Sequence, residues 1–227
     1  MFDDIVGRYD LLNDLLSLGF DRWWRRRTAA AMASAGGPVL DLGCGTGRLG
    51  ERLSGPWTVV GADIAHAMLV AARERVGKRL RLAPRERVGK RLRLVQASAF
   101  RLPFADRTFG GAVSGFVLRN LDDLPMAFGE LARVTKPGAP VALVDITEPR
   151  RAAFRQAFDV YFRTAAPALG GLAGKREAYR YLVASLAQLP PASEVSAMLE
   201  SAGFESARNR TLAPGVVTLW TARRSHG

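Results

Sequence analysis

The stretch Val39-Leu40-Asp41-Leu42-Gly43-Cys44-Gly45-Thr46-Gly47 decides the fold class of this chain. A short apolar strand runs into alternating glycines, and glycine lets the backbone approach a ligand that a Cβ atom would exclude. Asp63 follows Asp41 by 22 positions and comes directly after the next predicted strand, residues 58–62. A carboxylate there can accept hydrogen bonds from both hydroxyls of a ribose. The pattern predicts a nucleoside-binding α/β domain.

The glycine spacing narrows the class of nucleoside. A dinucleotide-binding loop has the pattern G-x-G-x-x-G, whereas Gly43, Gly45 and Gly47 give G-x-G-x-G, and the lysine of a P-loop is absent. A glycine turn without a ligand is the alternative, which the two aspartates at this spacing disfavour. Cys44 lies in the loop with no histidine obviously paired to it, so we interpret it as a small filler.

Short apolar segments alternate with helical ones along the chain. We expect strands at 39–42, 58–62, 92–96, 111–116, 141–146 and 216–222, and helices within 2–35, from near residue 46, and at 65–75, 122–134, 151–189 and 192–202. This alternation predicts an α/β fold with a doubly wound, mostly parallel sheet and right-handed crossovers. We interpret 1–227 as one domain, with a helical cap (1–35), a cofactor-binding core (36–149), a helical insertion (150–190) and a final helix and strands (191–227).

The chain is strongly basic. It has 33 Lys and Arg against 21 Asp and Glu, a formal net charge of +12, which favours anionic partners. Residues 73–82 and 85–94 both read RERVGKRLRL, a repeat too short for a solenoid unit. We interpret it as a local duplication that lengthens one helix-to-strand connection. An additional patch that contacts lipid or RNA is the alternative.

The cellular location is predicted from features that the sequence lacks. The N-terminus lacks the apolar region of a secretory signal, and no run approaches the roughly 18 apolar residues of a membrane span. The one cysteine forms no internal disulfide. We therefore expect a cytoplasmic protein. Two histidines and one cysteine, widely separated, predict no metal site.

Several motifs point to one enzyme family. The D-x-G-x-G-x-G loop resembles the first motif of class I methyltransferases, which wraps the methionine portion of S-adenosylmethionine. Further motifs are the segment 9–25 (YDLLNDLLSLGFDRWWR), Leu102-Pro103-Phe104, Leu118-Arg119-Asn120, Arg133-Val134-x-Lys136-Pro137-Gly138, Pro149, Tyr179-x-Tyr181-Leu182 and Ala202-Gly203-Phe204. On these residues the chain resembles the ubiquinone/menaquinone biosynthesis C-methyltransferase family. The resemblance implies a Rossmann-like fold and methylation of a ring carbon of a reduced polyprenyl quinone, first of all demethylmenaquinol.

The resemblance also implies a set of residues that bind S-adenosylmethionine. They are Asp41, Gly43, Cys44, Gly45, Thr46, Gly47, Asp63, Ile64, Met68, Ser98, Ala99, Ser114 and Gly115. Ser98 replaces the usual Asp or Asn expected to meet the adenine amino group, and the family's serine falls on Gly115. Val117 replaces a glycine, Asp145 a glutamate, and Trp220 a common histidine. Quinone specificity is the property that these departures put most in doubt.

The expected chemistry is methylation of a ring carbon beside an oxyanion. The protein must align the reactants, stabilise charge and assist proton removal. Arg119 is expected to stabilise the oxyanion or to order a water, and Asn120 to position the ring. A structural ion pair of Arg119 with Asp122 or Asp123 is the alternative. The less favoured candidates for the base are Asp145 and Tyr9.

The predicted substrate is apolar, and two segments suit it. Aromatic residues of the insertion are expected to line a pocket for the apolar tail, or else to be core; the substrate-binding candidates are Tyr161, Tyr179, Tyr181 and Phe116. Arg25–Arg27 beside Trp23 and Trp24 suit an anionic membrane surface, or else form a solvated face with buried tryptophans. A transient peripheral contact at the inner face of the membrane follows, and a homo-oligomer is left open.

Two other functional classes remain. One is a methyltransferase for another small molecule or for RNA, although the chain has no appended RNA-binding module and no obvious series of aromatic and basic residues for stacking bases. The other is a non-catalytic membrane-binding relative that has kept the fold, which Ser98 and Gly115 keep open. Nucleic acid is the less expected partner.

Overall fold

The structure, a computed structural model, describes residues 14, 17–82, 92–147, 149 and 189–226, with the backbone alone over 78–82. In these residues the strands form one seven-stranded sheet in the order β3-β2-β1-β4-β5-β7-β6. Strands β1 to β5 are parallel, and β7 runs antiparallel to both β5 and β6. Their bounds are β1 Val39–Leu42, β2 Val59–Asp63, β3 Leu92–Gln96, β4 Gly111–Gly115, β5 Pro140–Ile146, β6 Phe204–Leu212 and β7 Val217–Arg224. The predicted doubly wound, mostly parallel sheet is confirmed.

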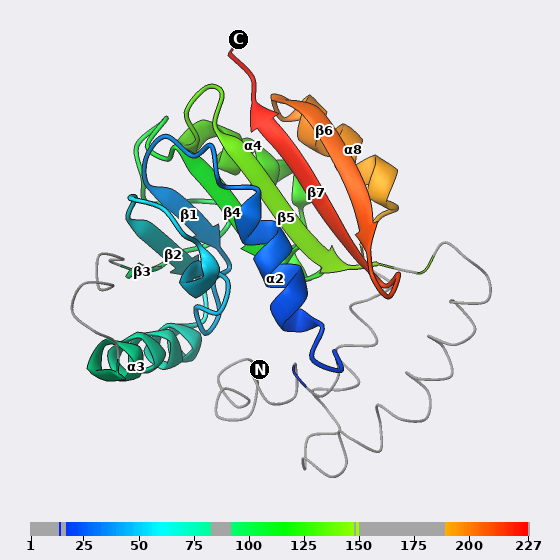
Figure 1. Ribbon diagram of the computed structural model, residues 1–227. Helices are drawn as coiled ribbons and strands as arrows, with labels where there is room; N and C mark the ends of the chain where they lie inside the picture. The colour runs from blue at the N-terminus through cyan, green and yellow to red at the C-terminus, as the bar shows by residue number, and fades with distance from the viewer. Residues whose placement is uncertain (1–13, 15–16, 83–91, 148, 150–188, 227) are drawn as a thin grey trace.

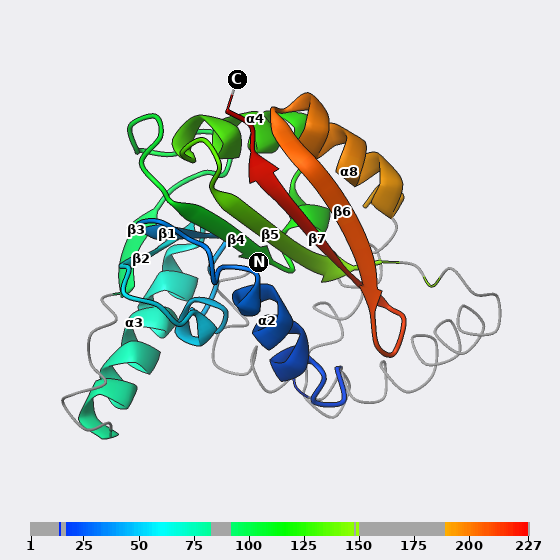
Figure 2. The ribbon, with the colours of Figure 1, turned by 45° about the horizontal axis from the view of Figure 1, so that its top comes forward.

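Helices cover both faces of the sheet (Figures 1 and 2). Helix α2 lies across one face, and α4 and α8 lie on the other. The helices are α2 Asp21–Ala30, α3 His66–Leu82, α4 Leu124–Val134 and α8 Ala192–Ser201, with 3₁₀ turns η1 Gly50–Arg52 and η3 Leu118–Asn120. No helix in the described part of the chain is long and apolar enough to cross a membrane.

The apolar core lies on both faces of the central strands. Strands β1 and β5 are buried along nearly their whole length, as expected when helices cover both faces of a parallel sheet. Trp220, which stands where the family often has histidine, is fully buried and donates its indole N–H to the Ala192 carbonyl at 2.9 Å. It therefore anchors α8 to the sheet.

Several expectations about local structure were wrong, and α2, for example, ends at Ala30 instead of near residue 35. The helix expected from near residue 46 is only the 3₁₀ turn η1, because the backbone is irregular there and Gly47 has a φ of +79°. Strand β4 ends one residue earlier than expected, since Phe116 has a φ of +65°. The final segment contains β6, which the sequence analysis did not locate, as well as the expected last strand.

The repeated segment is divided between two elements. Helix α3 continues past residue 75 to Leu82 and so includes the first copy, while β3 begins at Leu92 within the second copy. The helical insertion 150–190 lies outside the described residues except at 189 and 190, as does the cap up to residue 13.

Candidate active site

A cavity of about 250 Å³ opens at the carboxyl ends of β1, β2, β3 and β4. This is the edge where ligands bind in open α/β sheets. Most of the residues predicted to bind the cofactor line it: Gly43, Cys44, Gly45, Thr46, Asp63, Ile64, Met68, Ser98, Ala99 and Gly115. Three others, Asp41, Gly47 and Ser114, do not. The topology thus brings segments from four strand ends to one place.

The glycine loop has the backbone that its composition predicts. Gly43 and Gly45 have φ values of +63° and +52°, a region that favours glycine. A Cβ atom on Gly43 would lie 2.3 Å from a methyl carbon of Val117. A Cβ on Gly45 would meet nothing within 4 Å. Close packing therefore requires glycine at 43, and the left-handed backbone favours it at 45.

Asp63 holds the glycine loop against the end of β2. Its carboxylate accepts the Gly45 N–H at 2.7 Å and the Ala65 N–H at 2.9 Å. Burial raises the pKa of this carboxyl, and these backbone hydrogen bonds oppose the shift. Each carboxylate oxygen can accept a second hydrogen bond. Asp63 can therefore position the loop and still accept the hydroxyls of a ribose.

Asp41 lies behind the loop. Its Oδ2 accepts the Gly50 N–H at 2.8 Å, and its Oδ1 is buried with no hydrogen-bond partner among the described residues. Burial raises the pKa of Asp41 to about 7, although the positive charge of Arg25 and the Gly50 N–H both lower it. Asp41 thus supports the turn that follows the loop.

The region that follows β3 forms the end of the cavity expected to hold adenine. Ser98 and Ala99 line the cavity, as do the buried Met68 and the exposed Ile64. The Ser98 hydroxyl accepts the N–H of Phe100 at 3.2 Å. One further acceptor position and the hydroxyl proton remain, which is enough for one contact with an adenine amino group.

The opposite end of the cavity is formed around the end of β4. Gly115, Phe116 and Asn120 line it. Phe116 is a non-glycine residue with positive φ, a conformation that is uncommon outside turns and functional sites. Ser114 is buried and donates its hydroxyl to the Leu42 carbonyl at 2.8 Å, so it ties β4 to β1.

Arg119 and Asp145 form a buried ion pair beside this end. The guanidinium of Arg119 donates to Asp145, whose carboxylate also accepts the N–H groups of Arg119 at 3.2 Å and Ile146 at 2.7 Å. Neither side chain lines the cavity. The alternative expectation for Arg119, a structural ion pair, is confirmed, but the expected partner was wrong. Asp122 and Asp123 are exposed, and the partner is Asp145. The remaining candidates, Tyr9, Tyr161, Tyr179 and Tyr181, lie outside the described residues.

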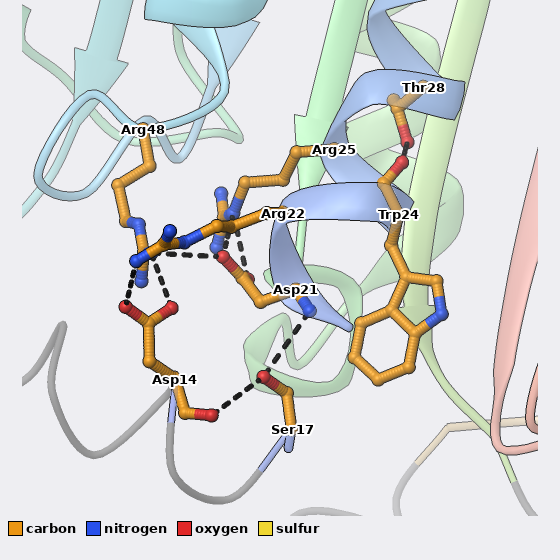
Figure 3. A network of polar contacts seen from close by, with 8 residues as sticks. All are labelled: Asp14, Ser17, Asp21, Arg22, Trp24, Arg25, Thr28 and Arg48. Carbon is orange, nitrogen blue, oxygen red and sulfur yellow. Dashed lines mark hydrogen bonds and ion pairs between the residues drawn. The ribbon is translucent and has the colours of Figure 1, made fainter. Parts of the chain in front are cut away.

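A polar network that was not predicted from the sequence joins α2 to the residue after the glycine loop (Figure 3). Asp21 accepts the Nε–H of Arg25 at 2.8 and 3.0 Å, and Arg48 after the glycine loop pairs with Asp14 at 2.6 Å and with Asp21 at 3.4 Å. Arg25 also lines the cavity. The spacing of Asp21 and Arg25, i and i+4 on a helix, was the signal that could have found this pair.

The basic stretch of α2 is therefore not one exposed surface. Arg25 and Trp24 are buried, and Trp24 donates its indole N–H to the Ala213 carbonyl at 2.7 Å. Arg26 and Arg27 are exposed, and Arg27 lies over the half-buried Trp23 at 5.2 Å. The membrane-facing role suggested for the whole stretch was wrong for Trp24 and Arg25.

Comparison with known proteins assigns the family. The model of the ubiE/COQ5 methyltransferase family matches residues 1–224. The chain belongs to the ubiE/COQ5 methyltransferase family. It is 40% identical to the demethylmenaquinone methyltransferase of Thermus thermophilus, with 99% of this chain and 100% of the relative covered. It is 33% identical to the ubiquinone/menaquinone biosynthesis C-methyltransferase UbiE of Geobacter sulfurreducens, with 99% and 87% covered.

A solved structure agrees with this family assignment at the level of the fold. It is a SAM-dependent methyltransferase from Aquifex aeolicus, with a TM-score of 0.56 and 22% identity over 82% of this chain and 81% of that chain. This member of the ubiE/COQ5 family is an S-adenosylmethionine-dependent methyltransferase. The cavity suits that cofactor, since it combines a carboxylate for the ribose with a glycine loop that admits a ligand close to the backbone.

Proposed function

We propose that this chain methylates a ring carbon of a reduced polyprenyl quinone, and foremost converts demethylmenaquinol to menaquinol. The observation that carries the proposal is a single cavity that joins the glycine loop and Asp63 to Phe116 and Asn120. The family and the names of relatives at 33–40% identity support quinone biosynthesis as the pathway.

The reaction needs little covalent chemistry from the protein. When bound, S-adenosylmethionine supplies an electrophilic methyl group on a positively charged sulfur. The ring carbon forms a new C–C bond as the methyl–sulfur bond breaks, and the ring hydrogen leaves as a proton. The oxyanion on the adjacent oxygen makes the carbon nucleophilic, so stabilising that charge lowers the barrier.

Two neighbouring residues are suited to orient the ring and to stabilise the oxyanion. Asn120 lines the cavity and donates its Nδ2–H to the Phe116 carbonyl at 3.4 Å, which places its amide at the wall where the ring is proposed to bind. Arg119 is the more exposed member of its ion pair, with 8% of its side chain exposed against 0% for Asp145. Its side chain does not line the cavity, so its positive charge would act from the turn η3 that also carries Asn120. In this proposal Arg119 supports the developing charge and Asp145 positions Arg119.

Asp145 is less suited to be the base. Its two oxygens already accept three hydrogen bonds, one of them from a guanidinium, and its side chain does not line the cavity. The role of Tyr9 stays a prediction.

The experiment is transfer of labelled methyl from S-adenosylmethionine to chemically reduced demethylmenaquinone in detergent. Label in menaquinone is the expected result. Bound cofactor without any label in menaquinone would contradict the quinol and favour another acceptor, which an RNA or small-molecule substrate would then reveal. Loss of both binding and transfer would favour a non-catalytic relative.

The role of Arg119 is tested with the paired change Arg119→Gln/Asp145→Asn, which leaves no buried carboxylate unpaired. We expect the turnover rate to fall about 10- to 100-fold, because a positive charge near the developing oxyanion is lost, with unchanged affinity for the cofactor. The double variant Glu205→Gln/Arg208→Gln, which neutralises one exposed charge of each sign on β6, is the control. Normal turnover in the Arg119 variant would contradict the assignment.

We also propose that the cytoplasmic enzyme contacts an anionic membrane surface at the N-terminal end of α2. Leu18 and Phe20 are 72% and 37% exposed there, and Arg22 and Arg26 of the helix that follows are also exposed. Apolar side chains flanked by arginines suit a lipid interface. The variant Leu18→Ser/Phe20→Ser should sediment less with vesicles that contain anionic lipid. Equal sedimentation of the variant and the parent would contradict this surface.

A further inference from the structure

The buried Arg25 lines the cavity but was not among the residues expected to bind the cofactor. It comes from α2, outside the sheet, and its side chain reaches the cavity at the end of β4. A Cβ atom on Gly115 would lie 3.5 Å from the Nη1 of Arg25. The guanidinium also lies over the ring of Phe116, 5.0 Å from its centroid. These contacts fix the terminal nitrogens at one end of the cavity.

Arg25 has unused hydrogen-bonding capacity. Asp21 takes only its Nε–H, at 2.8 and 3.0 Å. Within the described chain neither terminal nitrogen of Arg25 has a hydrogen-bond partner, and 9% of the side chain is exposed. A guanidinium presents five N–H donors in a planar fork that matches a carboxylate. A buried cation with free donors at a cavity wall is suited to an anionic ligand group.

The charges along the cavity indicate which group that is. Arg25 is the only basic side chain among the described residues that line it, and Asp63 and Asp122 are the acidic ones. S-adenosylmethionine carries two positive groups, the sulfonium and the ammonium, and one negative group, the carboxylate. A carboxylate is the part of the cofactor that needs a cation, because burying an unpaired charge is costly.

The order of the strands places the carboxylate at Arg25. Strands lie in the sequence β3-β2-β1-β4, and Asp63 ends β2, where it suits the ribose. Ser98 and Ala99, which follow β3, lie on the adenine side of Asp63. The rest of the cofactor must then extend past Gly43, at the end of β1, toward the end of β4. Arg25 lies at that end.

We infer that Arg25 binds the carboxylate of the methionine portion of S-adenosylmethionine through its two terminal nitrogens, and that Asp21 positions it. Figure 3 shows that Asp21 stands between Arg25 and Arg48, so one carboxylate orients both the cofactor-binding arginine and the arginine after the glycine loop. The helical cap thereby contributes directly to the cofactor site. The inference rests on the cofactor alone and does not require the quinol substrate.

The test compares two ligands by calorimetry, S-adenosylmethionine and its decarboxylated form, which keeps the adenosine, the sulfonium and the ammonium. The parent protein should bind the complete cofactor more tightly. In Arg25→Met, we expect its affinity for S-adenosylmethionine to fall about 10- to 100-fold, as for loss of a charged hydrogen-bonded pair. The affinity for the decarboxylated form should change by less than about threefold, so the preference nearly disappears.

Two further variants make the result decisive. Arg25→Gln/Asp21→Asn replaces the pair by neutral groups and gives the same readout if Arg25→Met alone does not fold. Arg26→Gln, at an exposed arginine of the same helix, should leave both affinities unchanged. Equal losses for the two ligands, or a preserved preference, would overturn the assignment. Preserved cofactor preference with a raised KM for the quinol would place Arg25 at the substrate. Failure of quinol methylation alone would leave the binding result standing.

Discussion

The buried carboxyl of Asp41 should make the stability of this protein depend on pH. Burial raises the pKa of Asp41 from 3.8 to about 7. The folded chain therefore keeps this proton up to about pH 7, whereas the unfolded chain loses it near pH 4. Folding takes up a proton between these values. The stability that Asp41 contributes is fully present below pH 4 and is lost as the pH rises through about 7.

The size of the effect follows from the two pKa values. Between about pH 5 and about pH 7.5 the linkage relation gives a loss of about 2 to 3 kcal/mol in the free energy of unfolding. The change Asp41→Asn removes the titration but keeps an oxygen that can accept the Gly50 N–H, now bonded at 2.8 Å. Its new amide group can occupy the position of the unpaired Oδ1.

The assay is urea denaturation of the cofactor-free protein at both pH values. The difference between the parent and Asp41→Asn cancels the other titrations and should shift by about 2 to 3 kcal/mol in favour of the variant at the higher pH. Asp122→Asn, a change at an exposed carboxylate, is the control and should show no such shift. A difference that is the same at both pH values would refute a buried Asp41 that titrates near neutrality.

Three other predictions test the framework of the site. Gly43→Ala places a Cβ 2.3 Å from a methyl carbon of Val117 at a φ of +63°. It should lower the free energy of unfolding by about 1 to 3 kcal/mol and weaken cofactor binding in calorimetry. Normal binding would contradict the close packing. Asp145→Asn leaves the buried guanidinium of Arg119 without its charged partner and should cost about 3 to 5 kcal/mol in urea denaturation, whereas a loss below about 1 kcal/mol would mean that the pair is solvated. Asp123→Ala removes the N-cap of α4 and should cost about 1 kcal/mol without changing cofactor affinity, which a binding titration checks.

Local sequence patterns predicted the parts of the fold that depend on neighbours in the chain. Strands at 39–42 and 92–96 were placed as β1 and β3 have them. The first is a short apolar segment between Gly-Gly-Pro and the glycine loop, and in the second Leu92 and Leu94 alternate with polar Arg93. Strand β6 was not located, since FESARNRTL is an edge strand with mostly exposed polar side chains and carries no apolar alternation. This segment is a strand because its backbone pairs with β7, which its composition does not indicate.

In the candidate site, too, the residues fixed by local sequence were predicted and those brought together by strand pairing were not. Glycines and Asp63 could be predicted because their roles depend on backbone conformation and strand ends, which the chain encodes locally. The partner of Arg119 could not be predicted, because Asp145 lies 26 residues away on β5. From the sequence alone, the nearer aspartates at 122 and 123 were equally plausible partners. Only the pairing of β4 with β5 brings the two together.

In helix α2, consecutive arginines have different environments and can therefore have different roles. Consecutive residues on a helix point about 100° apart, so Arg25 turns inward to Asp21 and the cavity while Arg26 and Arg27 stay exposed. The inward arginine can be held only because Asp21 is one helical turn before it and is itself buried. If the outer arginines meet anionic lipid and the inner one meets the cofactor carboxylate, one helix connects the membrane that carries the quinol to the site that carries the methyl group. Changing Arg25 should then alter cofactor affinity without altering vesicle binding, and changing Leu18 and Phe20 should do the reverse.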